Sequence, residues 1–394
     1  MKRKLVATML AMALCVTSLY GCGAGGAKKD DAKTSDQKNE SSASNSAGGS
    51  NELPEQFKGL KADKAYEFPL IVKSFQSTYW GAAQTGMKKA AAELGVKIEA
   101  QGPNSESDIA DQVNMLESKI AAKPAGIGIA ACDSKSVLDS FKKAAAAKIP
   151  LVCFDTGVAD APKGSVACTI ATDNRQAGSV AADHMYEVLK SQIAKADKPV
   201  RIGEINQDAT AANIQERGLG FVDRMIELIH KDGKTVSVTG NEFYVNNAKG
   251  ADKGDTNVVI EVRVPAQTTV ELCSNEAQAI LSKKDTIGVF GSNQVSAEGL
   301  LAANTNLNVL GSNAEKGDII GIGFDAGSTI KAAVKSGTML GAVTQSPLMM
   351  GYYAVYALTA AANGKTDLKD VATAGYWYDS KNMEDSSIAP NLYD

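Results

Sequence analysis

Polar side chains able to bind a ligand recur at one kind of position in the sequence, directly after short apolar runs that predict strands. Asp155 follows residues 151–154, and Asp325 follows residues 322–324. Open α/β sheets present their ligand-facing loops at the carboxyl ends of the strands, so these positions predict one shared site. Carboxylates accept hydrogen bonds, guanidinium groups donate them and amides do both. The candidates are Ser77, Tyr79, Trp80, Asp155, Arg217, Asn293, Asp325 and Gln345, with Gln76, Thr156 and Asp173 as further cleft or hinge residues.

Each candidate has a structural alternative that the sequence leaves open. Tyr79 and Trp80 could pack in a core or between lobes. The aspartates could cap turns or helices. Arg217 could lie on a helix surface, and the two amides could be ordinary loop groups.

Catalytic and cofactor-binding patterns are absent. The histidines, His184 and His230, are far apart and fall in predicted amphipathic helices, where a surface or helix-end role is expected. The sequence has no G-x-S-x-G, H-E-x-x-H or P-loop motif. Residues 126–131 fit a dinucleotide-binding fingerprint loosely, but the glycines lie inside an apolar run and Asp133 would repel a phosphate. We therefore predict no catalytic residue, no cofactor and no metal.

The cysteines beyond residue 22 lack the paired spacing of a metal or redox site. Each lies in an apolar run, which favours a small buried side chain. A disulfide between strand ends is the open alternative in an oxidising compartment. These residues are Cys132, Cys153, Cys168 and Cys273.

The N-terminus predicts export. Lys2, Arg3 and Lys4 precede an apolar run over residues 5–16 that is too short to span a bilayer permanently, which is typical of a secretory signal peptide. Residues 19–22 resemble the lipobox of bacterial lipoproteins, which implies a signal peptide of residues 1–21 and a lipid on Cys22. An ordinary signal peptide with a chance cysteine is the alternative.

Composition predicts a globular body behind a tether. The 394 residues are 44% hydrophobic and 22% charged, which suits a large core and two domains. The formal charge of -4 argues against a nucleic-acid partner, because phosphate binding needs a basic face. Residues 23–52 contain no Val, Ile, Leu, Met or aromatic side chain, so we predict that residues 22–65 form a flexible tether.

The body alternates strands and helices, which predicts parallel strands joined by right-handed helical crossovers, with helices on both faces of each sheet. Residues 243–257 are rich in Asn, Lys, Gly and Asp and predict a solvated excursion outside the core. Asp252 and Asp255 there do not match a calcium loop. Predicted strands include residues 68–72, 96–100, 125–131, 150–154, 200–205, 235–239, 287–290 and 320–324; predicted helices include residues 79–94, 109–121, 137–147, 177–192, 215–230, 275–281, 297–303 and 329–335.

Over residues 68–358 the sequence resembles the solute-binding proteins of ABC importers for ribose, galactose and similar sugars. The resemblance implies the α/β fold of type I periplasmic binding proteins, in which two Rossmann-like lobes with parallel sheets are joined by a three-strand hinge and hold the ligand between them. It implies a first lobe of residues 66–172 plus 346–371 and a second of residues 173–345 plus 372–394. The matching motifs are residues 149–155, 171–174, 217–221, 291–293, 321–325 and 344–345.

The resemblance also implies roles for the candidates. Tyr79 and Trp80 fall on the aromatic pair that sandwiches the sugar. The residues that fall on its hydroxyl-binding set are Asp155, Arg217, Asn293, Asp325 and Gln345. Such a mixture of donors and acceptors suits a polyol better than an anion, which would need several cations and no facing carboxylates. The chain departs from the ribose-binding branch at Thr156, where an Arg is typical, and at Ser77, where an Asn is frequent.

We therefore expect a monomeric, extracytoplasmic receptor, anchored to the membrane by lipid on Cys22, that captures a monosaccharide or related polyol. Its partners would be an ABC permease and the ATPase subunit of that importer. The alternative is a receptor that senses a sugar or furanose-like signal for a membrane kinase or chemoreceptor. A sugar-responsive repressor would need a DNA-binding headpiece where this chain has a signal peptide and tether, and an enzyme is not expected.

Overall fold

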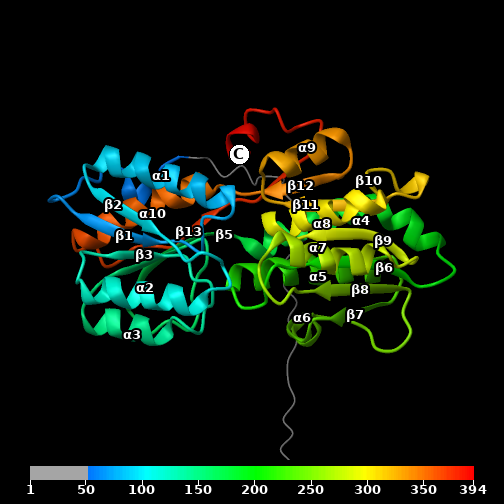
Figure 1. Cartoon of the computed structure of the whole chain (residues 1–394), viewed down its shortest axis with the longest axis horizontal. Helices are drawn as coiled ribbons and strands as arrows, with labels where there is room; N and C mark the ends of the chain where they lie inside the picture. Colours follow the sequence, from blue (N-terminus) through cyan, green and yellow to red (C-terminus); the bar gives the residue numbers. More distant parts are fainter. Residues whose placement is uncertain (1–51) are drawn as a thin grey trace, which may run out of the picture. The chain divides into compact units, whose positions relative to one another are not determined.

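The computed structural model describes residues 52–394, which form two parallel-stranded lobes with helices on both faces of each sheet (Figure 1). The first sheet has strand order β13-β5-β4-β3-β1-β2. Helices α1 and α10 pack on one face, and α2 and α3 pack on the other. The elements of this lobe are η1 (Glu55–Phe57), β1 (Glu67–Ile71), α1 (Thr78–Leu94), β2 (Lys97–Gln101), α2 (Ile109–Ala121), β3 (Ile127–Ile129), α3 (Leu138–Ala146), β4 (Leu151–Phe154), β5 (Val166–Thr172), α10 (Pro347–Ala362) and β13 (Val371–Thr373).

The second sheet has strand order β14-β12-β11-β9-β6-β8-β7, with β10 beside β11 and only β14 antiparallel to its neighbour. Helices α4 and α5 cover one face, and α7, α8 and α9 cover the other. The elements are α4 (Asn174–Lys195), β6 (Val200–Ile205), α5 (Ala212–Lys231), β7 (Val236–Gly240), α6 (Glu242–Asn247), β8 (Val258–Arg263), α7 (Val270–Leu281), β9 (Thr286–Gly291), α8 (Gln294–Leu307), β10 (Leu310–Gly311), η2 (Ala314–Lys316), β11 (Ile319–Phe324), α9 (Ser328–Ser336), β12 (Gly341–Thr344), β14 (Tyr376–Tyr378) and η3 (Ala389–Asn391).

The chain passes between the lobes at three adjacent places. It leaves the first sheet at Asp173, returns at residues 345–346 and leaves again at residues 374–375. The Thr172 hydroxyl donates a hydrogen bond to the side-chain oxygen of Gln345 (2.7 Å), which ties two of these crossings together. The predicted α/β fold of two lobes joined by a three-strand hinge is thereby confirmed.

Three helices begin at candidate site residues. The Ser77 hydroxyl accepts the N–H of the second residue of α1, and the Asp173 and Asn293 side chains accept N–H groups in the first turns of α4 and α8. Such caps satisfy donors that the helix leaves without partners. Ser77 and Asn293 therefore each start a helix and also line the cavity between the lobes, whereas Asp173 lies at the hinge.

The folded region begins before residue 66, so the predicted tether of residues 22–65 is too long. Phe57 on η1 is fully buried in the core beneath α1 and α10. Leu53 and Leu60 pack against the same core, which supplies the apolar contact that residues 23–52 lack. The predicted signal peptide and Cys22 lie outside the described residues.

The predicted excursion at residues 243–257 is wrong in its first part. Residues 242–247 form α6, and Tyr244 on this helix is fully buried with its hydroxyl donating to the backbone carbonyl of Ile214 (3.3 Å). A six-residue helix is too short to show helical periodicity in the sequence. Helix α5 also begins at Ala212, earlier than the predicted residue 215. Within residues 52–394, no helix is both long enough and apolar enough to cross a membrane.

Candidate functional site

A cavity lies where the two lobes meet, and all eight principal candidates line it. The further candidates do not line it: Gln76 is exposed, Asp173 is an exposed helix cap at the hinge, and Thr156 is buried and donates a hydrogen bond to Asp155. The cavity also contains residues that the sequence analysis did not select. These are Lys73, Glu106, Gln207, Asn213, Ile214, Gln294 and Val295.

Two aspartates occupy matching positions in the two lobes. Asp155 follows β4 and Asp325 follows β11, and both have left-handed backbone conformations, with φ of 62° and 71°. A side chain other than glycine adopts this conformation at a cost of about 1–2 kcal/mol. In each case the backbone N–H still bonds to the neighbouring strand, at Ile170 and Val343. The bend turns each carboxylate away from the sheet and toward the cavity.

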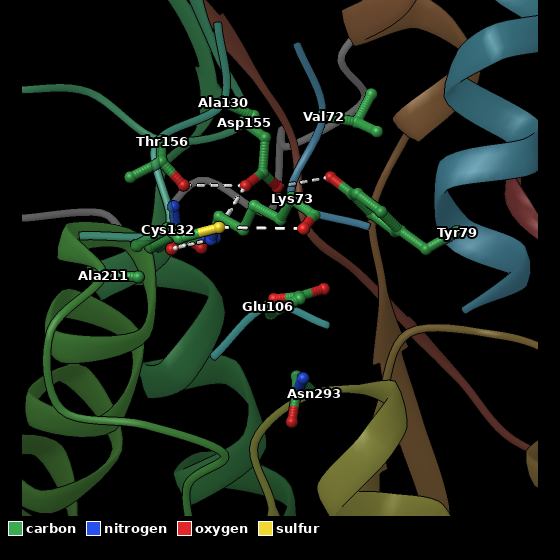
Figure 2. Close-up of polar contacts among 12 residues, drawn as sticks. Val72, Lys73, Tyr79, Glu106, Ala130, Cys132, Asp155, Thr156, Ala211 and Asn293 are labelled. Atoms are coloured by element: carbon green, nitrogen blue, oxygen red, sulfur yellow. Dashed lines mark hydrogen bonds and ion pairs between the residues drawn. The ribbon is translucent and has the colours of Figure 1, made fainter. Parts of the chain in front are cut away.

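Asp155 is the centre of the first-lobe half of the site (Figure 2). The hydroxyl of Tyr79 donates to one carboxylate oxygen (2.6 Å). The other oxygen accepts from the Thr156 hydroxyl (2.7 Å) and the Asn213 amide (3.1 Å), and it forms an ion pair with Lys73 (3.3 Å). Asn213 belongs to the second lobe, so this carboxylate also bonds across the cleft.

Lys73 places a cation beside Asp155, although the residue after Asp155 is Thr156 and carries no charge. It follows β1, its side chain is 2% exposed, and its ammonium group also donates to Asn213 (3.0 Å). Burial lowers the pKa of Lys73, but the charges of Asp155, Glu106 and a nearby aspartate outweigh burial, so the net shift is upward. Lys73 is therefore protonated at neutral pH and balances Asp155 in the place of the usual arginine.

Asp325 is the centre of the second-lobe half. One oxygen accepts from the Gln345 amide (2.7 Å), and the other accepts from the backbone N–H of Gln294 (3.0 Å). Burial raises the pKa of Asp325, while Arg217 and these hydrogen bonds oppose the rise. Gln345 lies on a hinge crossing, so the same amide belongs to the hinge and to the site.

Arg217 lies fully buried on α5, and two of its N–H donors form no hydrogen bond with the described residues. Its guanidinium stacks on the ring of Phe324, 3.7 Å from the ring centre. It donates to the Asn174 side chain (2.7 and 3.2 Å) and to the backbone carbonyl of Ser292 (2.8 Å). No carboxylate among the described residues lies within ion-pair distance of it. A guanidinium has five N–H donors, so two remain for a ligand oxygen.

Tyr79 and Trp80 form a corner of the cavity, which corrects the predicted sandwich. Both are buried, and their rings meet edge-on with centres 4.9 Å apart at 83°. Two rings in direct contact leave no space for a sugar between them, so each presents a separate wall. The Trp80 ring N–H donates to Glu106 (2.8 Å), whose pKa is raised by burial.

The remaining polar groups close the cleft from the second lobe. Gln207 follows β6 and donates to Glu106 across the cleft (2.7 Å), and the Asn293 amide donates to Gln207. The Ser77 hydroxyl donates to Gln294 (2.7 Å). Lys73 and Gln207 also follow apolar strands, so the strand-end rule that selected Asp155 and Asp325 could have found them. Glu106 carries no such signal, because it lies inside a loop.

The other candidates of the sequence analysis lie away from this chemistry. The four described cysteines are buried and free, and burial raises the pKa of Cys153, Cys168 and Cys273 to about 12. His184 stacks on Trp377, and His230 pairs with Asp252 (2.8 Å). Among residues 52–394, no group of three or more His, Cys, Asp or Glu side chains has the arrangement of a metal site.

The geometry matches a known family. A family model described as a periplasmic binding protein domain matches residues 68–366. The chain belongs to the periplasmic binding protein family. This membership confirms the family resemblance found in the sequence and implies a location outside the cytoplasm.

Relatives of this periplasmic binding protein share most of its length. The ribose import binding protein of Bacillus subtilis is 24% identical over 314 residues, which cover 78% of this chain and 86% of the relative. A solute-binding protein of an ABC transporter from Agrobacterium vitis, solved with D-fucose, has a TM-score of 0.68 and 26% identity, covering 83% of this chain and 100% of that one. A Brachyspira murdochii structure titled ABC transporter, LacI family transcriptional regulator, has a TM-score of 0.68 and 31% identity, covering 84% and 99%. Relatives described as binding proteins agree with the prediction that this chain is not an enzyme.

Proposed function

We propose that this periplasmic binding protein captures a monosaccharide or related polyol in the cavity between its lobes. The observation that carries the proposal is Arg217, a buried guanidinium with two unused donors that lines the same cavity as Asp155 and Asp325. A neutral ring with several hydroxyl groups would accept from Arg217 and donate to Asp155 and Asp325. The ribose and D-fucose named for the relatives belong to this chemical class.

The walls of the cavity support a sugar rather than a purely apolar ligand. Tyr79 and Trp80 offer apolar ring surfaces for the C–H groups of the sugar. The charged side chains Lys73, Glu106 and Asp155 are all bonded to protein partners, so a neutral ligand can exchange hydrogen bonds without leaving a buried charge uncompensated.

Contacts across the cleft support capture by closure. The Ser77 hydroxyl bonds to Gln294, and the Thr268 N–H bonds to the Ser107 hydroxyl (2.8 Å). These bonds can form only when the lobes are close together, and the first of them joins two residues that line the cavity. A ligand that forms hydrogen bonds with both lobes would shift the equilibrium between open and closed lobes toward the closed form.

We further propose that lipid on Cys22 anchors the protein outside the cell and that the closed form delivers its sugar to an ABC permease. The support is the lipobox-like segment at residues 19–22 and the ABC transporters named for the structural relatives. Mass spectrometry of the mature N-terminal peptide should find Cys22 carrying the added mass of a diacylglyceryl group. An unmodified Cys22 thiol would contradict the anchor while leaving sugar binding untouched.

A thermal-shift screen tests the sugar proposal. The purified chain is heated with pentoses, hexoses, polyols, nucleosides and amino acids in separate wells. A ligand at 100 times its dissociation constant stabilises the folded state by about 2.7 kcal/mol, which raises the melting temperature measurably. A shift with one or two sugars supports the proposal. A shift in melting temperature only with a nucleoside or an amino acid would support a ligand-binding role but contradict a sugar as the ligand.

A further inference from the structure

The C-terminal segment of residues 387–394 contacts both lobes. Leu392 packs against the core between the second sheet and α7, α8 and α9. The next residue, Tyr393, packs against the core of the first lobe beneath α1 and α10. Figure 1 marks the C-terminus between the two lobes. The segment therefore joins the lobes in addition to the three hinge crossings.

Hydrogen bonds hold this segment to one of those crossings. The Thr344 hydroxyl donates to the backbone carbonyl of Asn391 (2.8 Å), and the Ser346 hydroxyl donates to the Asn391 side chain. Asn391 is itself buried. Thr344 and Ser346 flank Gln345, the hinge amide that bonds to Asp325. The segment is thus fixed directly beside the ligand cavity.

Tyr393 meets one residue from each half of the site. Its ring lies edge-on to the ring of Tyr79, with centres 5.9 Å apart at 75°. Its hydroxyl oxygen is buried and has no hydrogen-bond partner of good geometry among the described residues. Burial, with the negative charge of Asp325, raises the pKa of Tyr393, so the hydroxyl stays neutral beside that carboxylate. The backbone carbonyl of Tyr393 accepts from the N–H of Gly327 (3.1 Å), two residues after Asp325.

Tyr393 also lines a second cavity, which Tyr79 does not line. Its other lining residues include Lys89, Met349 and Tyr352 of α1 and α10. Tyr79 lines the ligand cavity and contacts Tyr393, which lines this second one. The Tyr393 ring therefore contacts an aromatic residue of the ligand cavity, whose ring also meets Trp80.

We propose that Tyr393 is a positioning residue of the ligand site, which the C-terminal segment brings against Tyr79 and Asp325. It holds the Tyr79 ring at the angle at which the Tyr79 hydroxyl bonds to Asp155. Because Leu392 packs in the second lobe, the same segment links the Tyr79 ring to the position of that lobe. The inference rests on the proposed function, which assigns Tyr79 and Asp325 to ligand binding.

The test compares Tyr393→Ala and Tyr393→Phe with Met383→Ala in the full chain. Met383 is a suitable control because it is also in the C-terminal region and packs against the second-lobe core, but it does not line the ligand cavity. Dissociation constants for D-ribose, D-arabinose and D-fucose are measured by calorimetry, and stability is measured by urea unfolding. We expect Tyr393→Ala to weaken binding about tenfold, Tyr393→Phe to restore most of it through the ring contact, and Met383→Ala to lower stability alone.

A readout without sugar separates this inference from the proposed function. The chain has two tryptophans, so a Trp377→Phe background leaves Trp80, which contacts Tyr79, as the only tryptophan, and excitation at the red edge of the absorption band selects its emission. Movement of Tyr79 in Tyr393→Ala should shift the emission of Trp80 in the unliganded protein, and Met383→Ala should not. If no sugar binds to the parent chain but this shift occurs, the proposed function fails and the positioning role stands. Unchanged emission in Tyr393→Ala, or equal losses of affinity in Tyr393→Ala and Met383→Ala, would overturn the positioning role.

Discussion

At the scale of single residues, the buried pair of Lys73 and Asp155 decides how charge is balanced in the first-lobe half of the site. Lys73→Met would leave Asp155 buried without its cation, although its hydrogen bonds from Tyr79, Thr156 and Asn213 remain. We expect a loss of about 3 kcal/mol in the free energy of unfolding and weaker sugar binding. Urea unfolding at neutral pH measures the first quantity.

Lys119→Met is the matched control for that variant. Lys119 pairs with Glu99 at the surface (2.7 Å), and the glutamate side chain is 54% exposed. Removal of this lysine should cost less than about 1 kcal/mol, because solvent screens exposed ion pairs. Equal losses for the two variants would show that the Lys73–Asp155 pair has no special energetic role.

Glu204 gives a pH-dependent prediction. It lies fully buried on β6, one oxygen accepts from Asn206 (2.9 Å), and the other has no partner among the described groups. Burial raises the pKa of Glu204 well above 4.5. A carboxyl whose pKa is raised by folding adds stability below its unfolded pKa, and this stability is lost as pH rises from about 4.5 through the folded pKa.

The variant Glu204→Gln keeps the shape but cannot ionise. We expect its stability relative to the parent chain to increase steadily as pH rises above about 4.5, because only the parent must bury a charge or keep a proton. Melting temperatures of both proteins across a pH series give this difference. A difference that stays constant with pH would show that Glu204 does not titrate in the folded protein.

Site residues could be predicted from the sequence where they directly follow a strand. The strand-end rule selected Asp155 and Asp325 because both follow apolar runs, and it applies equally to Lys73 and Gln207. Glu106 could not be found this way, because its partners, Trp80 and Gln207, come from distant segments. The edge-on angle of Tyr79 and Trp80 also depends on packing rather than on sequence order.

At the scale of elements, the contact between α1 and α10 depends on glycines that let two backbones approach. A Cβ atom on Gly86 would lie 1.8 Å from the carbonyl oxygen of Leu348, whereas one on Gly81 of the same helix would meet nothing within 4 Å. Gly86→Ala should therefore force the helices apart and cost about 1–3 kcal/mol. Gly81→Ala should stabilise the protein by about 0.5–1 kcal/mol, because alanine loses less entropy in a helix.

Chemical denaturation of these two variants tests the packing of α1 against α10. Both variants carry the same Gly→Ala substitution in the same helix, so only the surroundings differ. We predict that the free energy of unfolding falls in Gly86→Ala and rises in Gly81→Ala. Destabilisation of similar size at both positions would mean that the described approach of α1 to α10 is not what limits the side chain at Gly86.

Elements with clear periodicity were predictable, whereas α10 and β8, like α6, were not. Helix α10 is buried over most of its surface, so it shows no alternation of polar and apolar positions. Strand β8 contains Glu261 and Arg263, and ion pairs with Arg201 (2.7 Å) and Lys283 (2.5 Å) satisfy the Glu261 carboxylate. Those partners lie far away in sequence, so the charges concealed a strand that is otherwise apolar.

At the scale of the whole molecule, the proposed function requires both lobes to contribute to one binding event. Asp155 and Tyr79 come from the first lobe, and Arg217 and Asp325 come from the second. The Asn213 amide already joins the halves by bonding to Asp155 (3.1 Å). Binding and closure should therefore be coupled, and loss of a side chain from either lobe should weaken both.

The most direct test is a calorimetric titration of D-ribose, D-arabinose and D-fucose into the parent chain and into Arg217→Ala. Hydrogen bonds to a charged group contribute about 1.5–3 kcal/mol each, so removal of the two free donors should weaken binding by well over tenfold. We predict one-to-one binding of at least one of these sugars to the parent chain and little or none to Arg217→Ala. Absence of binding by the parent chain, or equal affinity in the two proteins, would contradict a sugar site between the lobes.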